Sequence, residues 1–107
     1  MARARYPSAM LEIANDEAAR RWVARLDGEF AGYAEYRLGR GRMVFTHTVV
    51  EPQFEGRGIG TGLARAALDA AVAAEQRIVP YCPFITVYLR RHHEYDEWVD
   101  WPPAAKS

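Results

Sequence analysis

The sequence contains one cysteine and no net charge, and each scarcity excludes a class of protein. Cys82 alone provides neither an internal disulfide nor a multi-cysteine zinc site, which fits a reducing compartment. Fourteen basic and fourteen acidic residues cancel, so no net field draws the chain toward a polyanion. We therefore expect no nucleic-acid partner.

Long apolar runs are missing as well. No stretch approaches the roughly 18 consecutive apolar residues that a membrane helix requires. The first eight residues carry two arginines, but no apolar run follows them, as a secretory signal would require. These features predict a cytoplasmic protein with no membrane partner.

The residues that are present predict a folded domain. A length of 107 residues with 50% apolar and 26% charged side chains is typical of one globular unit. No repeat, low-complexity tract or linker divides the chain. We expect a single domain over residues 1–107, in which Pro102-Pro103 ends any helix and residues 102–107 form a flexible tail.

The first half of the chain has the period of β-strands. Residues 9–14 alternate weakly, and Asn15-Asp16-Glu17 resembles a cap before residues 18–20, so this segment fits a short helix or a turn between strands. Strands are predicted at residues 21–26, 30–38 and 43–51, with Asp27-Gly28 as a hairpin turn and Pro52 as the end of the third. The side chains predicted to face the core from the second strand are Phe30, Gly32, Ala34, Tyr36 and Leu38.

The second half changes to helical spacing. Alanine-rich residues 59–75 predict a helix, and residues 77–81 predict a short strand that a crossover places parallel to the strand at 43–51. A second helix is expected at residues 84–91, followed by a last apolar turn from Tyr95 to Trp101. The fold class is therefore α/β (α+β) with a mixed, mostly antiparallel sheet.

A glycine-rich segment at residues 54–63 lies between the strand at 43–51 and the helix at 59–75. Unpaired backbone N–H groups at a helix start bind anions, and glycines let a phosphate approach them closely. A dinucleotide fingerprint fails, because its third glycine would fall on Thr61 or Leu63, and a triphosphate loop fails because no lysine is near. The remaining alternatives are another anion site and a sharp turn that binds nothing.

Gly58-Ile59-Gly60 and several segments on either side of it together resemble the GNAT superfamily of N-acetyltransferases. Gly58-Ile59-Gly60 fits the glycines of its acyl-coenzyme A loop, although Glu55 stands where that pattern has Gln or Arg. The segments that extend the resemblance are Phe45-Thr46-His47-Thr48, Val79-Pro80-Tyr81-Cys82-Pro83-Phe84, Tyr88-Leu89-Arg90-Arg91-His92 and Tyr95. Together they resemble the minimal single-domain YjdJ-type subfamily, with a core at about residues 20–98 and a β-α-β coenzyme A-binding unit.

The resemblance implies a cofactor site. Acetyl-coenzyme A would be the cosubstrate, with its pantetheine arm in a slot between two splayed strands. The implied binding residues are Val49, Val50, Gly56, Arg57, Gly58, Ile59, Gly60, Thr61 and Arg90. Their backbone amides and guanidinium groups suit phosphate and pantetheine.

Acetyl transfer also needs a base, oxyanion donors and a proton source for the leaving thiolate. Cys82 is the candidate acid or transient acyl acceptor, Tyr88 the candidate thiolate acid, and His47 the candidate base. Core packing is the alternative for each of them. His92-His93-Glu94 and Asp96 lack a metal-ligand spacing, so no metal is expected.

The predicted function is acetyl transfer to an amine, either a small molecule or a protein lysine. A non-catalytic module that binds or senses acyl-coenzyme A is the alternative, and the protein is expected to be a monomer or a weak homodimer.

Overall fold

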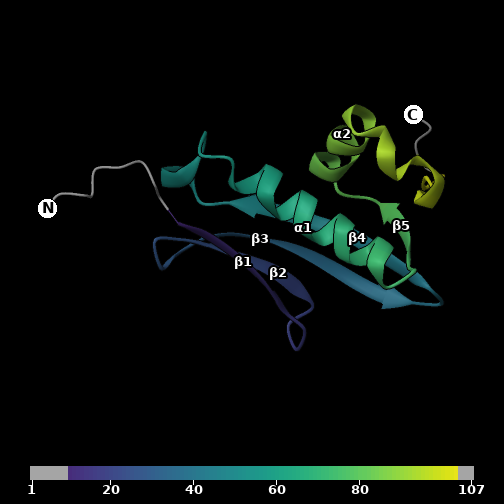
Figure 1. Cartoon of the computed structure of the whole chain (residues 1–107), viewed down its shortest axis with the longest axis horizontal. Helices are drawn as coiled ribbons and strands as arrows, with labels where there is room; N and C mark the ends of the chain where they lie inside the picture. Colours follow the sequence, from purple (N-terminus) through teal and green to yellow (C-terminus); the bar gives the residue numbers. More distant parts are fainter. Residues whose placement is uncertain (1–9, 104–107) are drawn as a thin grey trace, which may run out of the picture.

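The computed structural model describes residues 10–103, in which a five-stranded sheet lies against two helices (Figure 1). The strands are β1 (Leu11–Asp16), β2 (Arg21–Leu26), β3 (Glu29–Gly39), β4 (Arg42–Val50) and β5 (Arg77–Pro80), adjacent in chain order. The first four pair antiparallel and β4 pairs parallel with β5. The predicted α+β fold with a mixed, mostly antiparallel sheet is confirmed.

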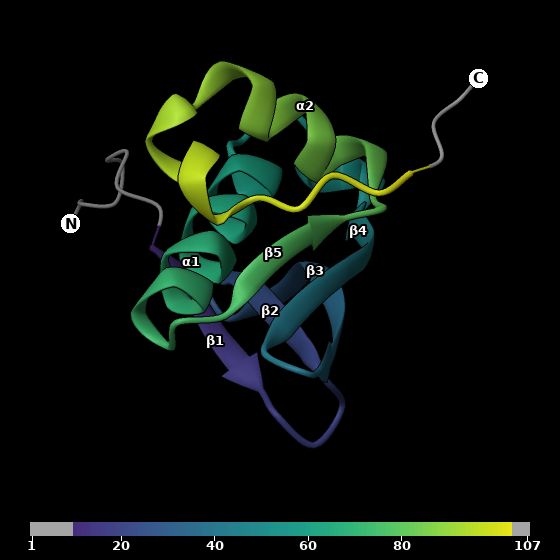
Figure 2. The same cartoon turned by 90° about the vertical axis from the view of Figure 1, so that its right-hand side faces the viewer.

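The helices occupy one face of this sheet. Helix α1 (Ile59–Ala73) lies along the sheet. Helix α2 (Pro83–Arg91) comes directly after β5 in the chain and lies on the same side of the sheet, as Figures 1 and 2 show together. Two 3-10 turns, η2 (Pro52–Phe54) and η3 (His93–Trp98), follow β4 and α2. Within residues 10–103, no helix is long and apolar enough to cross a membrane.

The segment before β2 corrects one prediction. Residues 11–16 form a full strand that pairs with β2 from Leu11↔Leu26 to Asp16↔Arg21, so a helix there is wrong and the turn between strands is confirmed. The pairing prevails because Ile13 and Leu11 bring their side chains against α1 beside Gly62. Asp16 instead stabilises the turn, where its carboxylate accepts the Ala19 N–H at 3.3 Å.

A bulge in β3 changes the predicted core face. The register shifts between Ala24↔Gly32 and Arg25↔Phe30, which leaves Ala31 as an extra, fully buried residue. Gly32, Ala34 and Tyr36 are buried as predicted. Phe30 is only half-buried and Leu38 is exposed at the strand end, so both are wrong as core residues.

Small residues let α1 pack closely on the sheet. Ala64, Ala67 and Ala71 are fully buried and belong to a core cluster that also includes Tyr36 and Phe45. Burying their methyl groups contributes on the order of 25 cal/mol per Å² of apolar surface removed from water. A second cluster around Ile59 and Leu63 extends this core beneath the start of the helix.

The chain after η3 covers the outer edge of β5. Ile78 forms a parallel bridge with Val99, and the Asp100 N–H donates to the Ile78 carbonyl oxygen at 2.8 Å. The Asp100 carboxylate accepts a 2.7 Å hydrogen bond from Arg77 and lies 3.6 Å from Arg42. The predicted flexible tail falls mainly on residues 104–107, and the predicted lack of a secretory signal concerns residues 1–9; both segments lie outside the described residues.

Candidate functional site

The glycine-rich loop between η2 and α1 owes its shape to two glycines. Gly56 and Gly58 both have φ of +80°, a left-handed conformation that other residues adopt at a cost. A Cβ at either position would meet nothing within 4 Å, so only the backbone conformation requires glycine. Gly58 is also the N-cap of α1, so the loop ends where the helix amides begin.

The start of α1 presents unpaired backbone donors. The first intrachain hydrogen bond at this end joins the Gly62 N–H to the Gly58 carbonyl oxygen at 3.0 Å. Among residues 10–103, no acceptor pairs with the N–H groups of Ile59, Gly60 and Thr61, as expected for a first helical turn. With the positive end of the helix dipole, these groups form an electropositive surface that suits an anion.

The other two loop glycines serve packing. A Cβ on Gly60 would stand 2.7 Å from Cζ of Phe84, which α2 places against the start of α1. A Cβ on Gly62 would stand 2.9 Å from the Ile13 side chain on β1. These two glycines are required by close approach, so the count of glycines overstates the part of the loop that serves ligand binding.

A cavity of about 360 Å³ opens in front of these amides. The predicted loop residues that line it are Gly56, Gly58, Ile59, Gly60 and Thr61, together with Val50. Phe54, Glu55 and Phe84 complete the wall, and Arg57 is not among the lining residues. The cavity is therefore bounded by backbone and apolar side chains, with the Glu55 carboxylate as its one charged group.

Beside this cavity, β4 continues beyond its pairing with β5. The two strands pair as far as Phe45↔Pro80, where the Tyr81 and Cys82 N–H groups both donate to the Phe45 carbonyl oxygen at 3.0 Å. The rest of β4 therefore extends past the end of β5. The slot that the resemblance implies would lie beside this unpaired part of β4.

Beyond Phe45, the backbone N–H and C=O groups of β4 point alternately toward β3 and toward the other edge of the strand. The Glu51 N–H donates to Ala31 at 2.8 Å, so the alternation of an antiparallel pair directs the backbone groups of Val49 toward β3 and those of Val50 and Thr48 away from it. Of the two predicted pantetheine contacts, Val50 has the suitable backbone direction. Thr48, which motif reasoning did not select for this role, shares it.

Cys82 lies beside the part of β4 that is not paired with β5. Its side chain is 2% exposed, and Sγ donates to Thr48 Oγ1 at 3.3 Å. Cys82 is also the N-cap of α2, and its carbonyl oxygen accepts the Thr86 N–H at 3.0 Å. The thiol is thus fixed between β4 and the start of α2.

Tyr88 belongs to the same core cluster as Cys82. Its ring stacks on the His92 ring with centroids 3.8 Å apart, and the His92 Nδ1 lies 2.8 Å from the Tyr88 carbonyl oxygen. Burial raises the pKa of the Tyr88 phenol, while the Arg65 guanidinium acts in the opposite direction. At neutral pH the phenol keeps its proton and is available as a donor.

His47 lies apart from these two groups. Neighbouring residues of a strand point to opposite faces, and Thr48 points toward Cys82, so His47 points to the face without α1. Its side chain is 67% exposed, and Nδ1 lies 3.0 Å from Glu35 Oε1. Thr46 Oγ1 donates to the same oxygen at 3.3 Å, beside a bulge between β3 and β4. The structure therefore groups Cys82 with Tyr88 but not with His47.

Arg90 is also distant from the loop. Its guanidinium lies over the Trp101 ring, 4.9 Å from the centroid, and it lines a separate hollow with Leu89 and His93. It stands six residues after Phe84 on α2, which is about 9 Å along the helix axis. A coenzyme A contact from Arg90 remains a prediction that this geometry does not favour.

Thr48 and Phe84 belong to segments that carry the family resemblance, but the sequence did not indicate a site role for either of them. Phe84 and Thr48 both contact predicted site residues from neighbouring elements, a relation that only tertiary packing creates. The sequence of the strand and that of the helix start, each taken alone, do not show that these side chains are in contact.

Over residues 10–103, no group of three or more His, Cys, Asp or Glu side chains gathers in a way that could hold a metal ion.

Comparison with known proteins agrees with this geometry. The profile of a family described as GCN5-related N-acetyl-transferase matches residues 21–98. Protein NATD1 of Xenopus tropicalis is 30% identical over 88 residues, which cover 80% of this chain and 81% of that protein. Protein NATD1 of Mus musculus is 30% identical over 99 residues, covering 86% and 90% of the two chains.

The mycothiol acetyltransferase of Nocardia farcinica is a third relative. It is 42% identical over 71 residues, which are 65% of this chain but only 23% of that longer protein. A solution structure of a GCN5-like protein from Staphylococcus aureus superposes with a TM-score of 0.67 at 21% identity. It covers 90% of this chain and 94% of the other, so the two share a fold.

The mixed five-stranded sheet with its parallel last pair, together with this superposition, defines a GCN5-like fold. Because the family profile matches more than half of its length, the chain belongs to the GCN5-related N-acetyltransferase family.

Proposed function

We propose that this protein transfers an acetyl group from acetyl-coenzyme A to an amine, and that backbone amides hold the cofactor pyrophosphate. The observation that carries the proposal is the row of unpaired N–H groups at Ile59, Gly60 and Thr61, which open onto the cavity beside Val50. A pyrophosphate can bind to such backbone amides without a lysine or an arginine in the lining. Among molecules that contain a pyrophosphate, membership of an N-acetyltransferase family favours coenzyme A.

The part of β4 that is not paired with β5 would give the pantetheine arm a place to lie. It runs from Val50, which lines the cavity, to Thr48, which contacts Cys82, and the backbone groups of both face away from β3. Pantetheine contains two amides, which such strand-edge groups can satisfy like an added strand. This direction brings the thioester end to the Cys82 thiol.

The side chains near that end fit distinct steps of the transfer. The acceptor nitrogen forms a bond to the acetyl carbon as the carbon–sulfur bond breaks, so the amine must lose a proton and the leaving thiolate must gain one. Tyr88 holds its proton at neutral pH, because burial raises its pKa, and suits the role of thiolate acid. Cys82 is the alternative acid or a transient acyl acceptor.

His47 would act from the other side of β4. Its Nδ1 lies 3.0 Å from Glu35 Oε1, a contact that orients the ring. An amine that approaches over the uncovered face of the sheet would meet His47 first. The base assignment thus requires an acceptor that enters on the face opposite α1.

The non-catalytic module remains the alternative function, and one observation favours it. His47 is separated from Cys82 and Tyr88 by the strand that carries it, so this candidate base does not stand beside the thiol. A thiol-release assay with acetyl-coenzyme A and a panel of amines and peptides separates the two functions. Turnover above the uncatalysed rate supports the enzyme, and tight binding without turnover supports the module.

Thr61→Asp is the sharpest test of the cradle. Thr61 is exposed in the first turn of α1, where an acidic residue favours the helix, so the fold should be kept or slightly stabilised. The added carboxylate should repel the pyrophosphate by roughly 2 kcal/mol, or about thirtyfold in Kd, measured by calorimetric titration with coenzyme A. Thr61→Asn is the matched uncharged control. Equal affinities for the two variants would contradict the proposal.

A further inference from the structure

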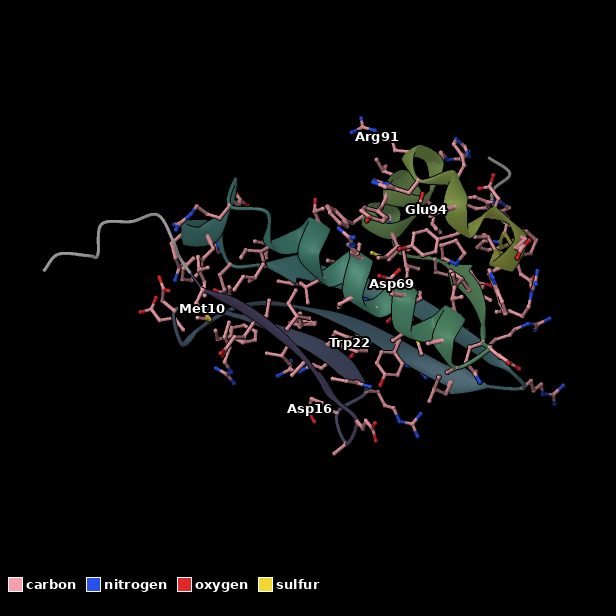
Figure 3. All side chains as sticks on the ribbon, viewed as in Figure 1. Met10, Asp16, Trp22, Asp69, Arg91 and Glu94 are labelled. Carbon is pink, nitrogen blue, oxygen red and sulfur yellow. The ribbon has the colours of Figure 1, made fainter. Side chains whose placement is uncertain are left out.

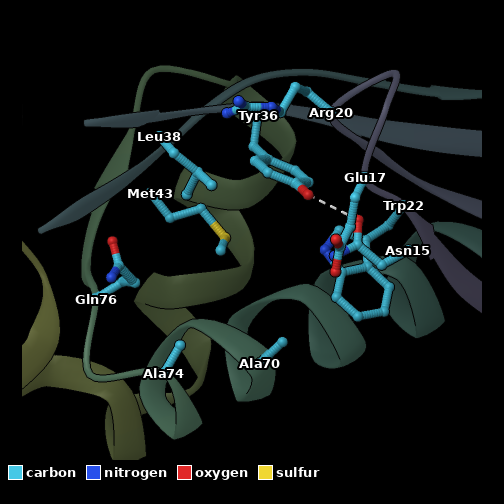
Figure 4. Close-up of a pocket in the computed structure, with 10 residues that line it drawn as sticks. All are labelled: Asn15, Glu17, Arg20, Trp22, Tyr36, Leu38, Met43, Ala70, Ala74 and Gln76. Carbon is cyan, nitrogen blue, oxygen red and sulfur yellow. Dashed lines mark hydrogen bonds between the residues drawn. The ribbon is translucent and has the colours of Figure 1, made fainter.

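A second cavity lies at the other end of α1. It has a volume of about 620 Å³ and opens between the helix and the sheet (Figure 4). Its apolar lining comes from Trp22, Leu38 and Met43 on the strands, from Ala70 on the helix and from Ala74 at the helix C-cap. The small alanines leave space that larger side chains would fill. Its size is within the usual range for sites that bind small molecules.

The polar side of this cavity is built on ordered structure. Tyr36 donates its hydroxyl proton to Asn15 Oδ1 at 2.7 Å, which fixes both side chains in the wall. The indole N–H of Trp22 is buried and has no hydrogen-bond acceptor among residues 10–103. Figure 3 places Trp22 between the sheet and α1. The indole is part of the cavity wall, so its N–H signal can report on what enters the cavity.

Two opposite charges stand at the same cavity. Glu17 and Arg20 both line it from the turn between β1 and β2. Hydrogen bonds hold that turn: the Arg20 N–H donates to the Glu17 carbonyl oxygen at 3.1 Å, and the Tyr36 N–H donates to the Arg20 carbonyl oxygen at 3.0 Å. Neither charged side chain belongs to any ion pair formed within residues 10–103.

This site is distinct from the coenzyme A cradle. Thr61 and Ala74 mark the two sites on α1, and 13 residues separate them, which is about 20 Å along the helix. The buried side chains of Phe45 and Leu68 belong to the core that lies between the two regions. A ligand here would therefore contact neither the glycine loop nor Cys82.

We propose that this cavity binds a free α-amino acid with an apolar side chain. Glu17 receives the ammonium group and Arg20 receives the carboxylate, since the two unpaired opposite charges match a zwitterion. The apolar side chain enters between Met43, Leu38 and the alanines of α1. The apolar side chain of such an amino acid would contact the apolar lining, and its charged groups would contact Glu17 and Arg20.

Leucine is the probe, and the Trp22 indole N–H signal in a ¹H–¹⁵N spectrum is the readout. Trp22→Phe assigns the signal by removing it. Leucine should shift this signal saturably, whereas isoamylamine, which lacks the carboxylate, and isocaproate, which lacks the ammonium, should bind at least about tenfold more weakly. No saturable shift with leucine at millimolar concentrations, or equal binding of the analogues, would overturn the proposal.

Substitutions test which residue contacts each group of leucine. Glu17→Gln should weaken leucine but not isocaproate, and Arg20→Gln should weaken leucine but not isoamylamine, because each removes one head-group contact. Ala74→Leu should abolish the leucine shift by filling the cavity. Ala73→Leu is its control, since Ala73 is exposed on the same turn but does not line the cavity. Unchanged leucine binding in all three site variants would contradict the assignment.

Discussion

The two ends of helix α1 differ in which atoms they offer to a ligand. The N-terminal end presents backbone N–H groups of Ile59, Gly60 and Thr61 beside apolar walls. The C-terminal end presents side chains, with Glu17 and Arg20 at the rim of a cavity. Backbone recognition tolerates many side chains if the loop conformation is kept, whereas side-chain recognition depends on particular residues. The two ends should therefore respond differently to substitution.

The largest expected effect concerns Gly60. Its substitution by alanine places a Cβ 2.7 Å from the Phe84 ring, so Gly60→Ala should lower the free energy of unfolding by about 1–3 kcal/mol through overpacking. Phe84→Ala should remove most of that cost. A double-mutant cycle by urea unfolding measures the coupling, and additive effects of the two substitutions would show that the contact is unimportant.

Tyr95 tests the side-chain contacts that hold the middle of α1. Its hydroxyl donates to Asp69 Oδ1 at 2.5 Å, so Tyr95→Phe should cost about 1–2 kcal/mol at pH 7. Figure 3 labels Asp69 on α1 and Glu94 on the segment that faces it. Burial first, and then the hydrogen bond to Asp69, raise the pKa of Tyr95 well above its ordinary value.

The sign of this pKa shift predicts an alkaline response. The raised pKa means that the folded state favours the protonated phenol, so the stabilisation is complete below the ordinary pKa of about 10 and is lost as pH rises through the higher folded value. Unfolding measured above pH 10 should therefore show a steeper loss in the wild type than in Tyr95→Phe. Parallel pH profiles would refute this assignment.

The smallest expected effects are at the loop side chains. Glu55 lines the cavity in front of the amides, so Glu55→Gln should tighten coenzyme A binding by about two- to threefold through reduced repulsion. Arg57 does not line the cavity, and Arg57→Gln should change the affinity by less than about threefold. Calorimetry at low salt measures the affinity of both variants for coenzyme A. A large loss of affinity in Arg57→Gln would show that a side chain, rather than the backbone amides alone, recognises the cofactor.

The sequence predicted most of the fold, because its periods and turn residues act locally. The helix at residues 59–75, the parallel strand after it and the Asp27-Gly28 hairpin are all confirmed within a few residues. β1 was missed because its pairing with β2 and its contact with Gly62 are tertiary. The prediction that Phe30 faces the core is wrong because Ala31 is an extra residue in the strand. One extra residue reverses the face to which the neighbouring side chains point.

The site was less predictable than the fold. The motif located the free amides correctly, but it could not separate Gly58, which needs a left-handed conformation, from Gly60, which needs room for Phe84. It also grouped His47 with Cys82, although adjacent strand positions face opposite ways. Faces and partners depend on register and packing, which a linear motif does not contain.

The backbone cradle is tested most directly by following the amide signals of residues 58–61 in a ¹H–¹⁵N spectrum during titration with coenzyme A. These signals should shift saturably and together, with one dissociation constant, while the Trp22 indole signal stays in place because it lies at the other end of α1. Amide signals that stay in place while coenzyme A binds elsewhere would contradict the cradle.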